Sequence, residues 1–240
     1  SIDGGEVESL FAVPEGYWRS MRWSPDGSQI AYLGSSQEIR VMNGDGTNDR
    51  FVTELEFPDD FAWSPDSQQI LFAADYDIGV VNVMNGTSTI LGGCAGDFQV
   101  RAVAWAHSGD RIAFWDWWNH NLVTAFPNGI SCNILASGNL LHGGCSPLSW
   151  SPDDQSIIFG HDGVLYRVPD SGGSPVEITQ VCDDWLGMGA LAWSPDGDYV
   201  AVTIGVVDSV ALVNSTTGEV YHLPYEIDDV GSLGWLPASR

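Results

Sequence analysis

The sequence predicts an all-β protein, a β-propeller of six blades with four antiparallel strands each, whose sixth blade is incomplete and made from both chain ends. Two observations predict it: a tryptophan motif that returns at a regular interval, and four short β signals within each interval. The motif first appears as Trp-Ser-Pro-Asp-Gly at residues 23–27, and its tryptophans are Trp23, Trp63, Trp105, Trp150, Trp193 and Trp235. The intervals are 40, 42, 45, 43 and 42 residues, and a fixed period of this length is typical of repeat folds.

Each period contains the same predicted elements in the same order. In the first, residues 20–23, 29–34, 38–42 and 50–53 have the short apolar runs of strands, separated by turn residues. In the motif, Pro presets a tight turn, Asp bonds the following amides, and Gly accepts the left-handed conformation that ends the turn. Each Trp follows an apolar residue by two positions, so both point to one face and are expected to pack between blades. No stretch has a sustained helical period, and we expect essentially no helix.

The number of blades follows from counting these elements. Tryptophans and later turns each occur six times, but the two middle strands occur only five times. We therefore expect the chain to open on an outer strand, residues 7–13, and to end just after an inner strand, residues 231–236. If these two strands meet, they form an incomplete sixth blade that protects an edge. Residues 1–240 would then be a single propeller domain, as a fragment of a longer chain or with the last blade finished by another segment.

The motif resembles the propeller repeat of the TolB-like family. The resemblance rests on Trp-Ser-Pro-Asp-Gly, an apolar run such as residues 30–32, and an Asn/Asp-Gly turn, and it covers nearly the whole chain. It implies a six-bladed ring in a periplasmic or extracellular protein, although the absent middle strands of the sixth repeat depart from the family pattern. Propellers with this motif also precede the hydrolase domain of prolyl-oligopeptidase-like peptidases.

The charge of the chain excludes several classes of partner. Acidic residues outnumber basic ones 32 to 8, no lysine occurs, and the net charge is −24. Nucleic acids and anionic membrane surfaces both require Lys or Arg, so neither is expected as a partner. No run of 18 apolar residues occurs, so no membrane insertion is expected. Use of Asp in turns explains most of the acidity, and adaptation to a calcium-rich or salty extracytoplasmic setting is the alternative.

Catalytic signatures are missing from the sequence. It contains no Gly-x-Ser-x-Gly elbow, His-Glu-x-x-His, P-loop or dinucleotide fingerprint, so we expect no enzyme. The first hypothesis is an extracytoplasmic binding module that docks a protein, peptide or glycan on one loop face. The alternatives are an assembly subunit that completes its open blade with another chain, and the propeller of a larger prolyl-oligopeptidase-like hydrolase.

Aromatic residues in the third repeat are the main binding candidates. Residues 114–120 read Phe-Trp-Asp-Trp-Trp-Asn-His, and we expect this loop to share a face with two other aromatic loops. The candidates are Trp18, Trp115, Trp117, Trp118, His120 and Trp185. Aromatic rings with polar neighbours suit a sugar or peptide platform, while the alternative is that the rings close gaps between blades.

Charged residues of the inner strands are the second group of candidates. Arg19, Arg22 and Arg101 are expected to face the central channel, and Asp59 and Asp60 take matching positions in the second repeat. The arginines could hold an anion or carboxylate at the channel mouth. Pairing between the arginines and the two aspartates across adjacent blades accounts for the same residues without a ligand, and we favour it.

The cysteines and loop acids complete the set of candidates. Cys94, Cys132, Cys145 and Cys182 follow no Cys-x-x-Cys spacing, so disulfides or buried thiols are expected rather than a zinc site. A Cys132–Cys145 bridge would close a separation of thirteen residues, and a Cys94–Cys182 bridge would have to cross two blades. No cofactor is expected. Calcium would suit the oxygen-rich residues 75–77 or 183–184, with solvated turn acids as the alternative.

Overall fold

The computed structural model describes residues 19–34, 36–74, 76–92, 99–138, 147–183, 188–204 and 209–223. These residues form twenty β-strands in five sheets of four strands each. Every pairing within the sheets is antiparallel. The described residues include no helix that could span a membrane. The predicted all-β propeller of four-stranded blades is therefore confirmed for this part of the chain.

Each blade is made from four strands that are consecutive in the sequence. Blade 1 consists of β1 (Arg19–Trp23), β2 (Gln29–Leu33), β3 (Glu38–Asn43) and β4 (Arg50–Glu54). Blade 2 consists of β5 (Pro58–Trp63), β6 (Gln69–Ala74), β7 (Asp77–Asn82) and β8 (Ser88–Ile90). Blade 3 consists of β9 (Val100–Trp105), β10 (Ile112–Asp116), β11 (Asn121–Ala125) and β12 (Asn133–Ser137). Blade 4 consists of β13 (Leu148–Trp150), β14 (Ser156–His161), β15 (Val164–Pro169) and β16 (Val176–Gln180). Blade 5 consists of β17 (Met188–Trp193), β18 (Tyr199–Ile204), β19 (Ser209–Asn214) and β20 (Val220–His222).

The prediction of six blades is wrong, because the described residues form five blades, each built from the strands of one repeat. Local hairpins build every blade, starting from the strand that ends in the motif Trp, and no strand is taken from another repeat. Counting tryptophans suggested a sixth blade because Trp235 repeats the start of the motif, but a blade needs the middle strands, which occur five times. The strands proposed for the sixth blade, residues 7–13 and 231–236, lie outside the described residues.

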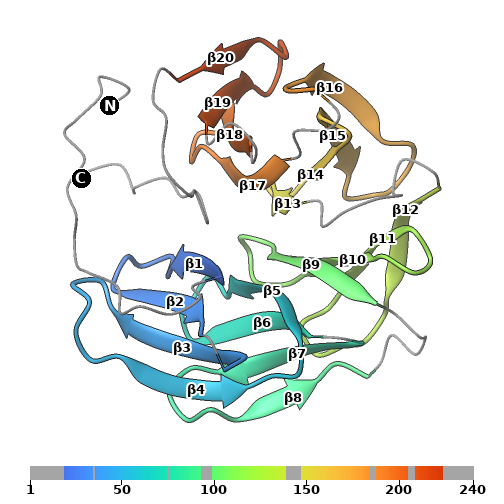
Figure 1. Ribbon diagram of the computed structural model, residues 1–240. Helices are drawn as coiled ribbons and strands as arrows, with labels where there is room; N and C mark the ends of the chain where they lie inside the picture. The colour runs from blue at the N-terminus through green and yellow to red at the C-terminus, as the bar shows by residue number, and fades with distance from the viewer. Residues whose placement is uncertain are drawn as a thin grey trace.

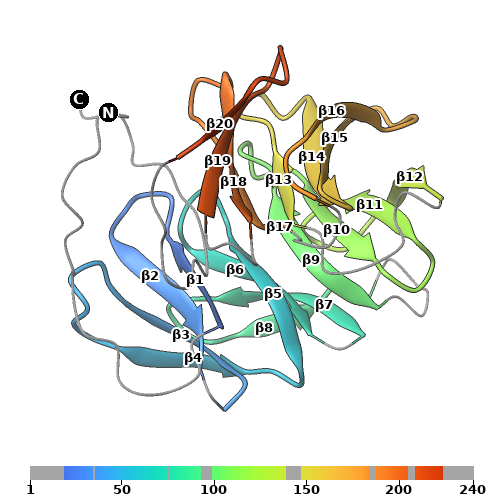
Figure 2. The ribbon, with the colours of Figure 1, turned by 45° about the horizontal axis from the view of Figure 1, so that its top comes forward.

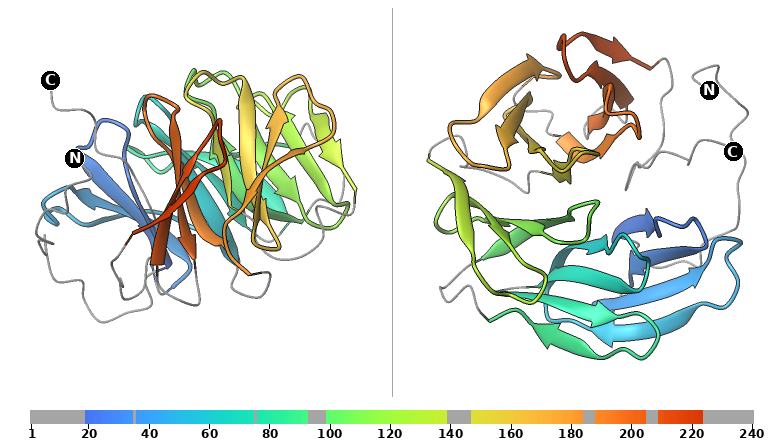
Figure 3. Two further views of the ribbon diagram at one scale, coloured as in Figure 1. Left: turned by 90° about the horizontal axis from the view of Figure 1, so that it is seen from above. Right: turned by 180° about the vertical axis from the view of Figure 1, so that it is seen from behind.

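The five sheets stand around a common centre, with the first strand of each blade innermost and the fourth outermost (Figure 1). The sheets are twisted, and their strands run between the two ends of the ring (Figures 2 and 3). Because neighbouring strands are antiparallel, the connections between blades share one end with the hairpins that join second and third strands. We call this end the connection face. The motif turns lie at the opposite end, the turn face.

The motif turns are held by their own side chains. In blade 1, Ser24 Oγ donates to Asp26 Oδ1 at 2.6 Å and accepts a hydrogen bond from the Gln29 amide at 2.9 Å. The same Ser–Asp bond joins Ser64 to Asp66, Ser151 to Asp153 and Ser194 to Asp196. All four serines are buried, and each hydroxyl accepts a hydrogen bond from the backbone amide of the residue that begins the second strand of its blade.

The third repeat replaces this arrangement with a bond from the next blade. Ala106 occupies the position of the serine and is buried. Asp154, from the motif turn of blade 4, accepts hydrogen bonds from the backbone amides of His107 and Ser108, both at 2.7 Å. The carboxylate that the third turn lacks is thus supplied by its neighbour.

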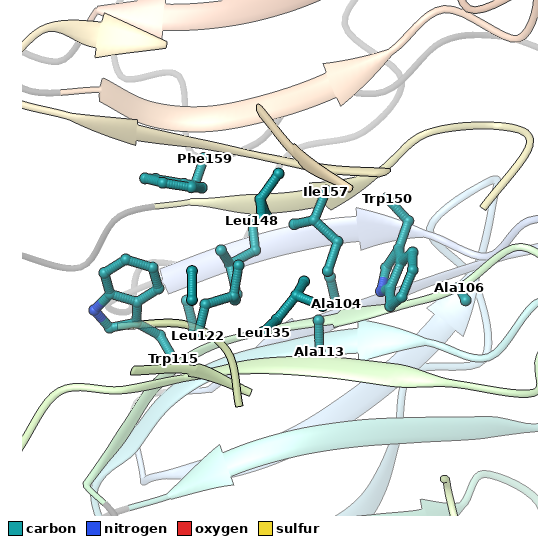
Figure 4. Close-up of a cluster of buried hydrophobic side chains, with 13 residues drawn as sticks. Ala104, Ala106, Ala113, Trp115, Leu122, Leu135, Leu148, Trp150, Ile157 and Phe159 are labelled. Atoms are coloured by element: carbon teal, nitrogen blue, oxygen red, sulfur yellow. The ribbon is translucent and has the colours of Figure 1, made fainter. Parts of the chain in front are cut away.

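Apolar side chains fill the spaces between adjacent blades. Between blades 3 and 4, Trp115 lies 5.5 Å from Phe159, measured between ring centroids, in a buried cluster that also contains Trp150 (Figure 4). Three similar clusters join blades 1 and 2, 2 and 3, and 4 and 5. The expected packing of motif tryptophans between blades is confirmed for Trp63 and Trp150. It is wrong for Trp23, which is 44% exposed and belongs to none of these clusters.

Candidate functional site

The inner strands of all five blades line a central cavity of about 370 Å³. Blade 1 contributes Ser20 and Arg22 to its wall, and blade 2 contributes Asp59 and Asp60. Most of the lining from blades 3, 4 and 5 is small or apolar, except for Arg101 and His107. The charged side chains of this cavity therefore gather on the side of the first three blades.

These charges are matched in pairs across blade boundaries. Arg22 Nη2 donates to Asp60 Oδ1 at 2.7 Å, and Arg101 Nη1 donates to Asp59 Oδ1 at 2.6 Å. Each arginine also lies over an aromatic ring, Arg22 over Phe61 at 5.2 Å and Arg101 over Trp117 at 5.7 Å. The pairing of arginines with Asp59 and Asp60 is as expected from the sequence. Arg19 begins β1, and its side chain falls outside what the structure describes.

A β-bulge allows the consecutive residues Asp59 and Asp60 to pair with arginines of two different blades. In β5, Pro58 pairs with Ala74 and Asp60 with Ala73, so Asp59 is the extra residue. In a regular strand, Asp59 and Asp60 would point to opposite faces, and the bulge re-aims the side chains locally. Sequence reasoning did not predict this bulge.

Asp60 joins three consecutive blades. Its Oδ1 accepts from Arg22 of blade 1, and its Oδ2 accepts from the Val103 amide of blade 3 at 3.0 Å. Burial raises the pKa of Asp60 against the opposing effects of Arg22 and these hydrogen bonds. Since both aspartates neutralise the arginines beside them, this wall of the cavity has no excess positive charge to attract an anion.

Other arginines also connect blades. Arg50 of blade 1 donates to the Val83 carbonyl of blade 2 at 2.5 Å, and Arg111 of blade 3 pairs with Asp170 of blade 4 at 2.6 Å. In a chain with only eight cations, a structural role for these arginines leaves little positive charge for ligand recognition.

The aromatic candidates of the third repeat lie in three different environments. Trp115 is fully buried between blades 3 and 4, and Trp117 is half-buried beneath Arg101. Trp118 is 67% exposed at the tip of the β10–β11 hairpin. His120 is half-buried at a positive φ of 53° in the same hairpin. Trp18 and Trp185 lie outside the described residues.

A buried carboxylate shapes this hairpin. Asp116 accepts from the Asn119 side chain at 2.8 Å and from the Asn119 amide at 3.3 Å. In this hairpin Trp118 is at the surface while Trp115 is in the core. Of the aromatic stretch, Trp118 is therefore the ring most available to a partner.

Two further exposed aromatic residues share the connection face with Trp118. Phe57, between blades 1 and 2, is 67% exposed, and Tyr76, in the β6–β7 hairpin, is 63% exposed. Together with Trp118 they are the three most exposed aromatic residues in the described part of the chain. Sequence reasoning did not select Phe57 or Tyr76 as binding residues, although aromatic residues placed in loops among acids were a visible signal.

The remaining candidates are only partly described. Cys94 and Cys145 lie outside the described residues, so the predicted disulfide pairings stay predictions. Cys132 packs against the cluster between blades 2 and 3, and Cys182 is half-buried beside the cluster between blades 4 and 5. Asp75 and Asp184, two of the calcium candidates, also lie outside the described residues. Among the residues described, no three His, Cys, Asp or Glu side chains are grouped to hold a metal ion.

Comparison with known structures supports the propeller fold. A chain in the crystal structure of a nidogen/laminin complex superposes with a TM-score of 0.73 at 13% identity, covering 89% of this chain and 81% of that one. TolB from Acinetobacter baumannii superposes with a TM-score of 0.62 at 18% identity, covering 87% of this chain and 52% of TolB. This chain shares their fold. At such identities the likeness shows the fold alone, and this chain spans about half the length of the TolB chain.

Sequence comparison does not assign the chain to a family. No protein-family model matches the chain, and no curated protein matches it. The resemblance of its motif to the TolB-like repeat is therefore supported at the level of the propeller, and not as membership of that family.

Proposed function

We propose that this propeller is a non-catalytic, extracytoplasmic module that binds a protein through its connection face. The observation that carries the proposal is the placement of Phe57, Tyr76 and Trp118, the three most exposed aromatic residues described, on three loops of that one face. Large exposed aromatic side chains are typical anchors of protein interfaces.

The spread of these residues favours a protein over a small ligand. They belong to loops of the first three blades rather than to one pocket, so a broad partner surface is needed to cover them. A related fold occurs in a complex of nidogen with laminin, which supports the use of such a ring in a protein–protein complex.

A role without chemistry is supported by the central cavity. Its arginines and aspartates are engaged with one another, and the sequence contains none of the nucleophile, metal or nucleotide motifs that would supply a reaction. An extracytoplasmic location is supported by the resemblance of the repeat to the TolB-like family.

The test is to isolate a partner by cross-linking and then measure its affinity for purified variants. We expect Phe57→Ala combined with Trp118→Ala to weaken binding roughly tenfold or more, because truncation of anchor residues costs over about 1.4 kcal/mol. The matched control is Phe126→Ala, which removes an exposed aromatic residue from the β11–β12 hairpin on the turn face. Equal losses in the two variants, or a loss only in the control, would contradict the proposal.

A further inference from the structure

A groove opens at the connection face between the outer parts of blades 1 and 2. It has a volume of about 320 Å³; residues 53–56 form its blade 1 wall, and parts of β6, β7 and β8 with Tyr76 form its blade 2 wall. We call it the acidic groove. Its volume is at the lower end of the range for ligand sites, enough for one or two side chains.

The floor of the acidic groove is apolar. Leu55, Phe72 and Ala74 are buried beneath it, while Tyr76 and Ile90 stand at its rim and are 63% and 49% exposed. An apolar floor with exposed apolar rim residues favours a partner that brings an apolar side chain of its own.

A glycine keeps the floor in this shape. Gly79 of β7 lies opposite Phe72 of β6 and Ile90 of β8, so the three positions share one row across the sheet. A Cβ at Gly79 would overlap the Phe72 ring. The missing side chain at Gly79 leaves the space that the Phe72 ring occupies beneath the groove.

Three exposed carboxylates line the same groove, those of Glu54, Glu56 and Asp77. None of the three makes a side-chain hydrogen bond or ion pair with another described residue, in contrast to Asp59, Asp60 and Asp170. No basic residue lines the groove, and the described acids are not grouped to hold a metal ion. Their charge is therefore available to cationic side chains of a partner.

A second groove shows that this charge is not imposed by the fold. Between blades 4 and 5, a cavity of about 450 Å³ occupies the corresponding place. There Gln180 and Cys182 flank the buried Val181, as Glu54 and Glu56 flank Leu55. The amides of Leu55 and Val181 each donate a hydrogen bond to a carbonyl in the hairpin between the second and third strands of their own blade, that of Gln37 or Gly163. Ser209 and His222 hold the positions of Asp77 and Ile90 by strand register. The propeller builds both grooves, but only the first combines three carboxylates with an apolar rim.

We propose that the acidic groove binds a segment of a protein partner in which an apolar side chain is flanked by Lys or Arg. The apolar side chain enters the groove between Tyr76 and Ile90, and the flanking cations meet Glu54, Glu56 and Asp77. The net charge of −24 on the whole chain attracts such a segment over a distance. The inference rests on the proposed function, because the groove lies on the face proposed to dock the partner.

The test uses short capped peptides as probes, with the whole 240-residue chain labelled with nitrogen-15 for NMR titration. A peptide containing Arg-Leu-Arg should bind roughly tenfold more tightly than one containing Arg-Ser-Arg or Glu-Leu-Glu, because it alone matches both the floor and the carboxylates. Its shifts should centre on the amides of Leu55, Asp77 and Ile90. Equal affinity for the three peptides, or shifts centred on the groove between blades 4 and 5, would overturn the proposal.

Substitutions then separate charge at the groove from charge elsewhere. Glu54→Gln, Glu56→Gln and Asp77→Asn combined should weaken the Arg-Leu-Arg peptide roughly tenfold at low salt. The control combination, Asp110→Asn, Glu177→Gln and Asp198→Asn, removes the same charge from exposed positions outside the groove and should change affinity less than about twofold. Glu56→Gln alone serves if the triple variant folds poorly, and should weaken binding about threefold. Equal losses in the groove and control variants would contradict the proposal.

The outcomes for the two proposals differ. If an isolated partner loses affinity with Phe57→Ala and Trp118→Ala but not with the groove substitutions, the connection face is the docking surface and the acidic groove is not its basic-segment site. If the groove substitutions weaken that partner as they weaken the peptide, both proposals stand.

Discussion

Arg22 of blade 1 donates to Asp60 of blade 2 at 2.7 Å, and the same carboxylate accepts the Val103 amide of blade 3 at 3.0 Å. One acidic side chain thus connects three blades at the wall of the central cavity. Removing one member of a partly buried charge pair leaves the other without compensation, which costs more than the pair contributes.

We therefore expect Asp60→Asn to lower the free energy of unfolding by about 2–4 kcal/mol, measured by urea denaturation. The control is Asp49→Asn, which changes the more exposed pair of Arg40 and Asp49 within blade 1 and should cost less than about 1 kcal/mol. Similar losses in the two variants would show that the pair between blades, Arg22 and Asp60, contributes no more to the free energy of unfolding than a pair within one blade.

The hydrogen bonds from the motif turn of blade 3 to Asp154 of blade 4 should make the stability of the protein depend on pH. Burial opposes ionisation of Asp154, but the amides of Ser108 and His107 outweigh it and hold its pKa below the usual value. A lowered pKa in the folded state gives stability that is full above the unfolded value of about 3.9 and is lost as pH falls through the folded value. Asp154→Asn should therefore flatten the fall in unfolding free energy below about pH 4. Denaturation curves at pH 2 to 6 test this, and parallel profiles for the two proteins would contradict it.

Trp115 and Trp118 are close in sequence and differ completely in burial. Trp115→Ala opens a cavity between blades 3 and 4 and should cost about 3–5 kcal/mol. Trp118→Ala removes a ring that is 67% exposed and should change stability by less than about 0.5 kcal/mol. Urea denaturation of both variants measures the difference. A large loss for Trp118→Ala would mean that its ring packs within the fold and is not available to a partner.

The repeat made much of this fold predictable. The hairpin at Trp23 and the four strands of blade 1 follow from local turn chemistry and apolar runs, which the sequence displays directly. The blade count failed because Trp235 signals a strand without the middle strands that a blade needs. The bulge at Asp59 and the different burial of Trp115 and Trp118 depend on how neighbouring blades pack, and no local pattern encodes that.

Gly79 offers a test of the groove floor that is independent of charge. A methyl group there would overlap the buried Phe72 ring, so we expect Gly79→Ala to lower the free energy of unfolding by about 1–3 kcal/mol. The control is Gly92→Ala, where an added Cβ meets no atom within 4 Å and little change is expected. Because the displaced ring would fill part of the acidic groove, Gly79→Ala should also weaken the Arg-Leu-Arg peptide while the charges of Glu54, Glu56 and Asp77 remain. Thermal or urea denaturation gives the first effect and NMR titration the second. A destabilised variant that binds the peptide unchanged would show that the apolar floor takes no part in binding.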